Sequence, residues 1–175
     1  DYASSLSNLG NVYKNLGDFK KSEEFLLLAK DLREKVLGKE HADYANTLNS
    51  LANLYMEIGN YESAELLYTE TLLIREKTLG KDHSSYAKTL NNIAYLYQLL
   101  GRFEKSELLY KEAIIIKEKV VGKMHPSYAT SLANLGLLYS DIGEYQKAEF
   151  LFLESKRIRE SILGKEHPDY SKSLN

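Results

Sequence analysis

The chain has 175 residues, of which 23 are basic and 25 acidic, and it contains no cysteine. The absence of cysteine excludes disulfides and thiolate metal sites, and the nearly balanced charge, without blocks of one sign, gives no basic surface for nucleic acid or an anionic membrane. Because no apolar run approaches the ~18 residues of a membrane span, we expect a soluble, cytoplasmic protein with no membrane and no nucleic-acid partner.

A period of 42 residues runs through the whole chain. Its markers are tyrosines at Tyr2, Tyr44, Tyr86, Tyr128 and Tyr170 and histidines at His41, His83, His125 and His167. The period gives units of approximately 1–42, 43–84, 85–126 and 127–168, with the start of a fifth at 169–175. A fixed period means that each unit packs mainly on its neighbours, so we predict a single array over residues 1–175 without a central core. Because Asp1 lies within a repeat phase, we expect the natural amino terminus to lie upstream of it.

The first helix of each unit is predicted to follow the repeated tyrosine. In the second unit the apolar positions with the spacing of a helix that buries one face are Leu48, Leu51, Ala52, Leu54, Tyr55 and Ile58. Asp43 precedes the tyrosine, and an acidic or hydroxyl side chain at this position suits a helix N-terminus. Gly59 suits the left-handed conformation that ends a helix, so we predict a turn there.

The second helix of the unit is predicted to run from about Tyr61 to Leu79, where Gly80 ends it. The residues along its buried side are Ala64, Leu67, Tyr68, Thr71, Ile74 and Thr78. The loop to the next unit has only a few residues, which permits only an antiparallel return. The sequence therefore predicts eight helices in four antiparallel pairs, no strand, and the beginning of a ninth helix over residues 166–175.

Six residues of each unit have the spacing of a known repeat. In the second unit they are Leu48, Leu51, Ala52, Tyr55, Ala64 and Tyr68, which resemble the W-x2-L-G-x2-Y…A-x3-F pattern of the tetratricopeptide repeat (TPR). The segment from Ile74 to Gly80, followed by K-x-H-x-x-Y-A, resembles the kinesin light chain type of TPR. The resemblance implies an all-α, TPR-type α-solenoid, a right-handed superhelix of stacked antiparallel helix pairs whose first helices line a concave groove.

The repeated positions offer no chemistry for catalysis or metal binding. Neighbouring histidines are separated by a whole repeat, about 10 Å from helix packing distances, whereas one metal ion needs ligands at ~2 Å. We therefore predict that His41 and its counterparts cap or pack the turn between units. The acids near them repeat with the loop, and the single glycines form no phosphate-binding loop. The sequence predicts no enzyme activity, no catalytic residue, no metal and no cofactor.

One face of the first helices is predicted to point away from the core and to line the groove for an extended peptide. The residues of this face are Asn49, Asn53, Lys88, Asn91, Asn92, Tyr95, Gln98, Leu99, Asn134 and Leu137. Amides can pair with a peptide backbone without reading its sequence. Tyr95 lies outside the phases on which the other tyrosines repeat, and with Leu99 and Leu137 it makes the third and fourth units more apolar. We expect these three residues to provide selectivity.

The leading interpretation is a protein-binding scaffold that holds an extended peptide or a partner helix in this groove. Two alternatives stay open. One is a spacer or self-association region, with end-to-end contact through uncapped terminal repeats. The other is the regulatory arm of a larger multidomain enzyme whose catalytic domain lies outside these residues. A chaperone-type carboxylate clamp is present only in part, because Asn49 and Asn91 stand where that clamp has lysine.

Overall fold

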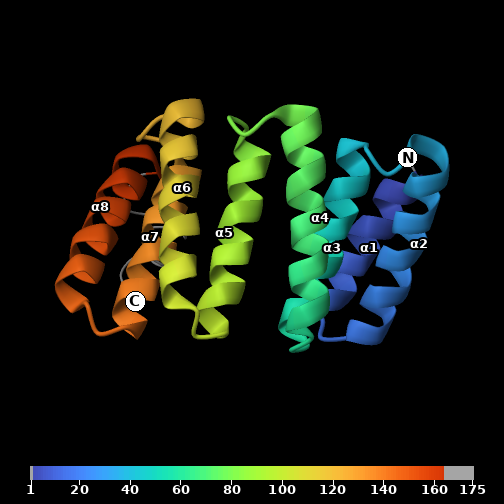
Figure 1. Cartoon of the computed structure of the whole chain (residues 1–175), viewed down its shortest axis with the longest axis horizontal. Coiled ribbons are helices and arrows are strands. Elements are labelled where there is room, and N and C mark those ends of the chain that lie inside the picture. The colour runs from blue at the N-terminus through green and yellow to red at the C-terminus, as the bar shows by residue number, and fades with distance from the viewer. Residues whose placement is uncertain (1, 164–175) are drawn as a thin grey trace. The chain divides into compact units, whose positions relative to one another are not determined.

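The computed structural model describes residues 2–163, which form eight α-helices and no strand (Figure 1). The helices are α1 (Tyr2–Asn15), α2 (Phe19–Leu37), α3 (Ala42–Glu57), α4 (Tyr61–Leu79), α5 (Ser84–Leu99), α6 (Phe103–Val121), α7 (Pro126–Asp141) and α8 (Tyr145–Leu163). The prediction of eight helices is confirmed, and the ninth helix predicted over residues 166–175 lies outside the described residues. None of these eight helices combines the length and the apolar composition that crossing a bilayer requires.

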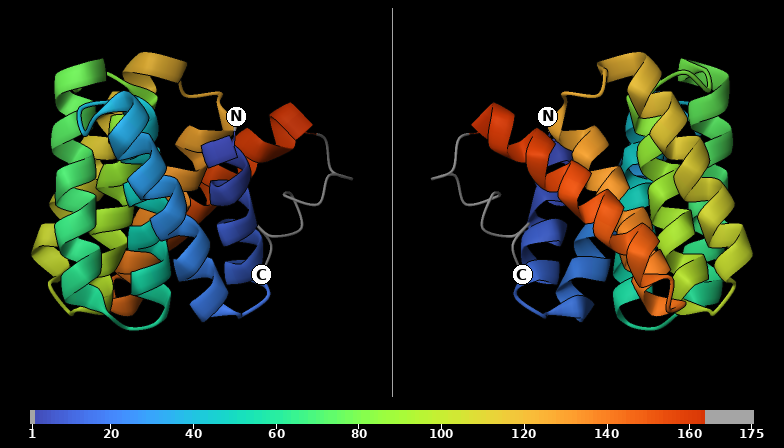
Figure 2. Two further views of the ribbon diagram at one scale, coloured as in Figure 1. Left: turned by 90° about the vertical axis from the view of Figure 1, so that its right-hand side faces the viewer. Right: turned by 90° about the vertical axis from the view of Figure 1, so that its left-hand side faces the viewer.

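The chain divides into two compact units, residues 1–81 and 82–175. From here on, unit means one of these two halves, each of which contains two of the sequence repeats. The first contains the hairpins α1–α2 and α3–α4, with α2 packed on α3. The second contains the hairpins α5–α6 and α7–α8, with α6 packed on α7. The helices of each hairpin are antiparallel, as the α1–α2 hairpin shows in the left view of Figure 2. Each unit is therefore a stack of two hairpins, as the sequence predicts.

A histidine begins each first helix for which the structure describes the preceding loop. The Nδ1 atoms of His41, His83 and His125 accept hydrogen bonds from backbone N–H groups two residues later, each at 3.1 Å. This bond satisfies one of the donors that a helix start leaves without an intrahelical partner. The predicted capping role of these histidines is confirmed. The capping acceptor is the histidine side chain. From the sequence we expected the helix to start two residues later, at the position of Asp43.

A glycine in the left-handed region separates the two helices of each hairpin. Gly59 has φ of 79°, and the N–H of Asn60 reaches back to the carbonyl of Tyr55 at 2.8 Å. The same bond joins Asp18 to Tyr13 at the end of α1. Left-handed φ costs other residue types free energy, so glycine fixes the position of the turn.

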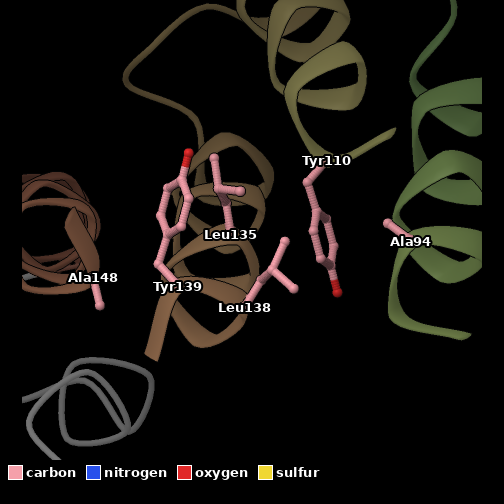
Figure 3. Close-up of a cluster of buried hydrophobic side chains, with 6 residues drawn as sticks. All are labelled: Ala94, Tyr110, Leu135, Leu138, Tyr139 and Ala148. Atoms are coloured by element: carbon pink, nitrogen blue, oxygen red, sulfur yellow. The ribbon is translucent and has the colours of Figure 1, made fainter. Parts of the chain in front are cut away.

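The apolar core of each unit lies where one hairpin packs on the next. In the second unit this core contains Ala94, Tyr110, Leu135, Leu138, Tyr139 and Ala148 (Figure 3). Figure 3 shows the side chain of Leu138, from α7, directed toward the ring of Tyr110, from α6. Tyr110 is 1% exposed. The corresponding core of the first unit contains Leu26 from α2 and Leu51 and Leu54 from α3.

A buried cation lies in the second half of α2, α4 and α6, and in α2 and α6 it belongs to the same joint. Arg33, Arg75 and Lys117 are 6%, 4% and 6% exposed. In the first unit Arg33 donates to the Ser4 hydroxyl of α1 (3.1 Å), the Asp43 carbonyl (3.0 Å) and the Thr47 hydroxyl of α3 (2.6 Å). In the second unit Lys117 donates to the Ser127 carbonyl at the start of α7 (3.0 Å). Arg33 and Lys117 therefore each link their own helix to the start of the next hairpin of the same unit.

Two tyrosines of the second unit test this assignment of core and surface. Tyr110→Ala should cost about 3–5 kcal/mol of unfolding free energy because it empties a buried aromatic site. Tyr95 is 43% exposed, so Tyr95→Ala should cost less than about 1 kcal/mol. Chemical denaturation of the two variants measures both values. Equal losses would contradict the assignment of the two faces.

The buried ammonium of Lys117 should make stability depend on pH. Burial, and then the nearby Lys88 ammonium, lower the pKa of Lys117 to about 8. An unfolded chain holds a lysine proton up to about pH 10.4, so between these values the unfolded state binds more protons and stability rises with pH. Compared with Lys117→Met, the wild type should gain about 2 kcal/mol of unfolding free energy between pH 7 and about 9.5. Urea titrations at each pH give this difference.

The methionine variant is also the control for the other titrating groups. Burial raises the pKa of Tyr44 and Tyr55 to about 12, whereas a tyrosine of the unfolded chain has a pKa of about 10, so these residues lower stability as the pH rises above about 10. Both tyrosines are present in the two proteins, so their effect cancels in the comparison. A difference that stays constant over the whole pH range would contradict a buried, charged Lys117.

Candidate functional site

Eight of the ten residues predicted to line the groove belong to the second unit. Asn49 and Asn53 lie on α3 in the first unit. On α5 lie Lys88, Asn91, Asn92, Tyr95, Gln98 and Leu99, and on α7 lie Asn134 and Leu137. Within the second unit α5 contacts α7 directly. The residues on α5 and α7 can therefore be described as one surface, which we call the first-helix face of the second unit.

Three large apolar side chains are exposed on this face. Tyr95, Leu99 and Leu137 are 43%, 44% and 51% exposed. Tyr95 and Leu137 occupy the same phase of the repeat on adjacent first helices, and Leu99 lies one turn after Tyr95. At the same phase α1 and α3 carry Asn11 and Asn53, both partly buried. The second unit thus replaces an amide by an apolar side chain twice at a position that the core does not use.

The prediction that all ten residues are exposed is wrong for three of them. Asn49, Asn91 and Gln98 are 5%, 6% and 8% exposed. The Nδ2 atom of Asn91 donates to the Ala87 carbonyl of its own helix at 2.9 Å. Because these three side chains are buried, they do not present their amides to a ligand.

Gln98 occupies the centre of a polar network that joins three helices. Its Nε2 atom donates to Asp141 Oδ2 at the end of α7 (2.6 Å), and its Oε1 atom accepts from the hydroxyl of Tyr110 on α6 (3.2 Å). Burial is the main reason that the pKa of Tyr110 lies well above its usual range, so this hydroxyl remains a donor. The network holds α5, α6 and α7 together.

The first unit contains a charged link at the same two phases. Lys14 of α1 forms an ion pair with Glu57 of α3 at 2.6 Å. Lys14 corresponds to Gln98 and Glu57 corresponds to Asp141, so each link joins residues 43 positions apart. Sequence reasoning missed this pairing because it treated each helix alone. Complementary side chains at a separation of one repeat plus one residue are the signal that could have revealed it.

The remaining predicted residues are accessible to a partner. Lys88 is exposed, and Asn53, Asn92 and Asn134 are partly exposed. Asn53 Oδ1 accepts a hydrogen bond from the hydroxyl of Tyr68 on α4. The accessible part of the first-helix face therefore combines apolar side chains, amides and one lysine.

A separate hollow of about 390 Å³ lies beside α7 and α8. It is lined by Leu135, Tyr139, Gln146, Lys147, Phe150 and Leu151. Lys147 lies over the ring of Tyr139, with its Nζ atom 5.3 Å from the ring centroid. The lining is mainly apolar and brings together no acid, base and nucleophile. Within residues 2–163 no cluster of three or more histidine or carboxylate side chains is arranged to hold a metal ion.

Comparisons with known proteins agree with this architecture. The structure is similar to the crystal structure of BtubC (BKLC) from P. vanneervenii, with 28% sequence identity and a TM-score of 0.80 over 95% of this chain and 66% of that chain. Two crystal structures of a putative kinesin light chain with nearly identical TPR-like repeats from Podosopora anserina, one of them of a single-residue variant, have 26% identity and a TM-score of 0.79. They match 97% of this chain and 80% and 81% of their own chains.

The sequence comparison identifies the family. The chain spans just under two thirds of the BtubC chain. A comparison with curated proteins found no match. The family model for the tetratricopeptide repeat matches residues 1–77, 52–119 and 86–161, which together run through all four hairpins. The chain therefore belongs to the tetratricopeptide repeat family.

Proposed function

We propose that this chain is a scaffold that binds an extended peptide or a partner helix on its first helices, with the main anchor in the second unit. Tetratricopeptide repeats generally mediate contacts between proteins, and stacked repeats present extended binding surfaces. The observation that carries the proposal is the exposure of Tyr95, Leu99 and Leu137 on adjacent helices, at positions that depart from the repeat. Apolar side chains at such positions do not stabilise the fold and are available to a partner.

The surroundings of these residues favour binding. A desolvated aromatic or aliphatic anchor commonly provides most of the binding free energy, while the polar groups around it contribute little. Asn92 and Asn134, at one phase on α5 and α7, are partly exposed beside the anchor. Their amides could pair with the backbone of an extended ligand. The network of Gln98, Tyr110 and Asp141 holds the helices in place, which lowers the entropic cost of binding.

A double variant tests the anchor. Peptides are first selected on the wild-type chain from a random-peptide display library, and their affinities are then measured by fluorescence anisotropy. Tyr95→Ala combined with Leu137→Ala should weaken binding by more than about 2 kcal/mol because the partner loses its apolar contact. The melting temperature should stay nearly unchanged, since both residues are exposed.

The matched control removes a similar apolar area from a second helix. Leu108 and Ile115 of α6 are 68% and 67% exposed. Leu108→Ala combined with Ile115→Ala should leave the affinity for the same peptides nearly unchanged. If instead the control variant loses binding and the Tyr95, Leu137 variant keeps it, the partner binds the second helices and the proposed site is wrong.

A second candidate function, end-to-end self-association, has its own supporting observation. Tyr2, Leu9 and Val12 of α1 are 72%, 43% and 51% exposed, whereas their counterparts on α3, Tyr44, Leu51 and Leu54, are at most 2% exposed. That face of α3 packs on α2. On α8, Glu149 corresponds to Glu23 and Glu107, which accept hydrogen bonds from Tyr55 and Tyr139 of the next first helix. The α1 helix of a second copy could therefore pack on α8 by the contacts that join hairpins within each unit.

Sedimentation velocity distinguishes this candidate from a monomeric scaffold. The wild-type sedimentation coefficient should rise with protein concentration, and Leu9→Asp combined with Val12→Asp should weaken the association at least about tenfold by placing charges in the apolar joint. Peptide binding to the second unit should not change in this variant. A wild-type coefficient that is independent of concentration would exclude the self-association.

A further inference from the structure

Two large apolar side chains form a stripe along the outer side of α6. Leu108 and Ile115 are 68% and 67% exposed, and they lie seven residues apart, close to two helical turns. The opposite side of the same helix carries the buried residues Tyr110 and Ala113. Exposed apolar residues that occur singly are ordinary on protein surfaces. This stripe, which we call the α6 stripe, therefore indicates a partner only if its surroundings do so as well.

The α6 stripe is flanked by charges of alternating sign. A helix turns by 100° per residue, so the neighbouring exposed positions fall on two sides of the stripe at three levels along the helix. The first side carries Glu104, Lys111 and Glu118, and the second side carries Lys105, Glu112 and Lys119. All six residues are exposed. At each level, the two sides of the stripe therefore carry opposite charges.

This pattern is complementary to itself when two helices run parallel. A two-fold axis parallel to α6 would place Leu108 on Leu108 and Ile115 on Ile115 of a second copy, and the first side of each helix would face the second side of the other. The facing pairs would be Glu104 with Lys105, Lys111 with Glu112, and Glu118 with Lys119, each present twice. Opposite charges would thus meet at all three levels.

An antiparallel pair of the same helices is disfavoured. With Leu108 on Ile115 of the second copy, the first side would face the first side of the other helix. Glu104 would then face Glu118, and Lys111 would face its own copy, and such contacts between like charges oppose association. A shift by seven residues would bring opposite charges together, but it would leave one of the two apolar residues uncovered. The charges therefore favour a parallel arrangement.

The second helix α4 carries a similar stripe without this charge pattern. Leu66 and Leu73, at the phases of Leu108 and Ile115, are 71% and 62% exposed. The flanking residues are Glu62, Thr69 and Glu76 on the first side and Ser63, Glu70 and Lys77 on the second. In a parallel pair of α4 helices, opposite charges would face each other at one level only. The α4 stripe is therefore a matched control for the α6 stripe.

Several of the charges on α6 have partners within the chain. The pairs are Lys111 with Glu107, Lys119 with Asp82, and Lys123 with Glu118. The side chains of these pairs are largely exposed, and exposed ion pairs contribute little to stability. Their long side chains can therefore turn toward a second copy at small cost.

We propose that α6 is an interface for a second copy of this chain, which forms a parallel, two-fold symmetric dimer through Leu108, Ile115 and the six charges around them. This proposal does not rest on peptide binding by the first helices. It also differs from end-to-end association, which uses α1 and α8 and has no closed symmetry. A contact between two single helices is at the small end of protein interfaces, so the dimer should be weak and sensitive to salt.

Disulfide crosslinking tests the orientation, because the chain contains no cysteine of its own. Leu108→Cys and Ile115→Cys are prepared as separate proteins and oxidised alone and as an equimolar mixture. In a parallel dimer each variant should crosslink to itself, and the mixture should give little mixed disulfide, since the two positions lie about 10 Å apart along the axis. A mixed disulfide that exceeds both self-disulfides would indicate an antiparallel pair and overturn the proposal.

The control for random collision is Leu66→Cys, at the same phase on α4. Its side chain is as exposed as that of Leu108, so its thiol should be as accessible. Leu108→Cys should crosslink at least about tenfold faster, because the dimer holds its two thiols together. Equal rates for the two variants would overturn the proposal.

Sedimentation equilibrium measures the affinity of the dimer. The full chain carries Leu9→Asp and Val12→Asp in this experiment, so that end-to-end association does not contribute. This protein should reach a dimer and nothing larger, and adding Leu108→Ala with Ile115→Ala should weaken the dimer at least about tenfold. A protein that stays monomeric at every concentration, or a dimer that is indifferent to the added changes, would overturn the proposal.

A charge exchange tests the pairing of the two sides in the same background. Glu104→Lys alone should weaken the dimer at least about fivefold, because a lysine would then face Lys105 of the second copy. Adding Lys105→Glu exchanges the two signs and should restore the affinity. A double variant as weak as the single one would refute the proposed pairing. Peptide affinity is measured on the same proteins and should stay unchanged, so this proposal and the proposed function can fail independently.

Discussion

The packing of each second helix on the first helix of the following hairpin is the interaction on which the rest of each unit depends. One hairpin cannot cover the apolar sides of its own helices, so it needs a neighbour. In the first unit Leu26, Leu51 and Leu54 are at most 1% exposed at this joint. At its edge Glu23 accepts from the hydroxyl of Tyr55 (2.6 Å), and Arg33 binds the start of α3. Apolar burial stabilises the stack, and these directional bonds fix how one hairpin sits on the next.

Residues that follow the repeat build this joint, whereas residues that break the repeat form the candidate site. Tyr110 and its counterpart Tyr68 are both buried and hydrogen-bonded through their hydroxyls. Tyr95 has amides as counterparts in the first unit and remains exposed. A regular scaffold tolerates such departures because they lie on a face that the core does not use. The same separation allows the exposed residues to change without loss of stability.

Much of the fold could be predicted because it depends on local rules. The spacing of apolar positions and the single glycines predicted the bounds of α4, Tyr61–Leu79, without error. The burial of Asn91 and Gln98 could not be predicted from the periodicity of one helix, since it depends on neighbouring helices. For Gln98 the neighbours are Tyr110 and Asp141, which come from α6 and α7.

The links that join residues 43 positions apart have a consequence for how such a chain can evolve. Each link has one half on one hairpin and one half on the next, as in the pair of Lys14 and Glu57 and the pair of Gln98 and Asp141. Unequal recombination between repeats of equal length preserves the reading frame and the fold. It also brings residues of different links opposite one another. A recombinant with Lys14 opposite Asp141 would keep a favourable charged contact. One with Gln98 opposite Glu57 would keep a polar pair. The order of hairpins can therefore be shuffled at low cost in stability, while each hairpin carries its own set of exposed residues to a new position in the array.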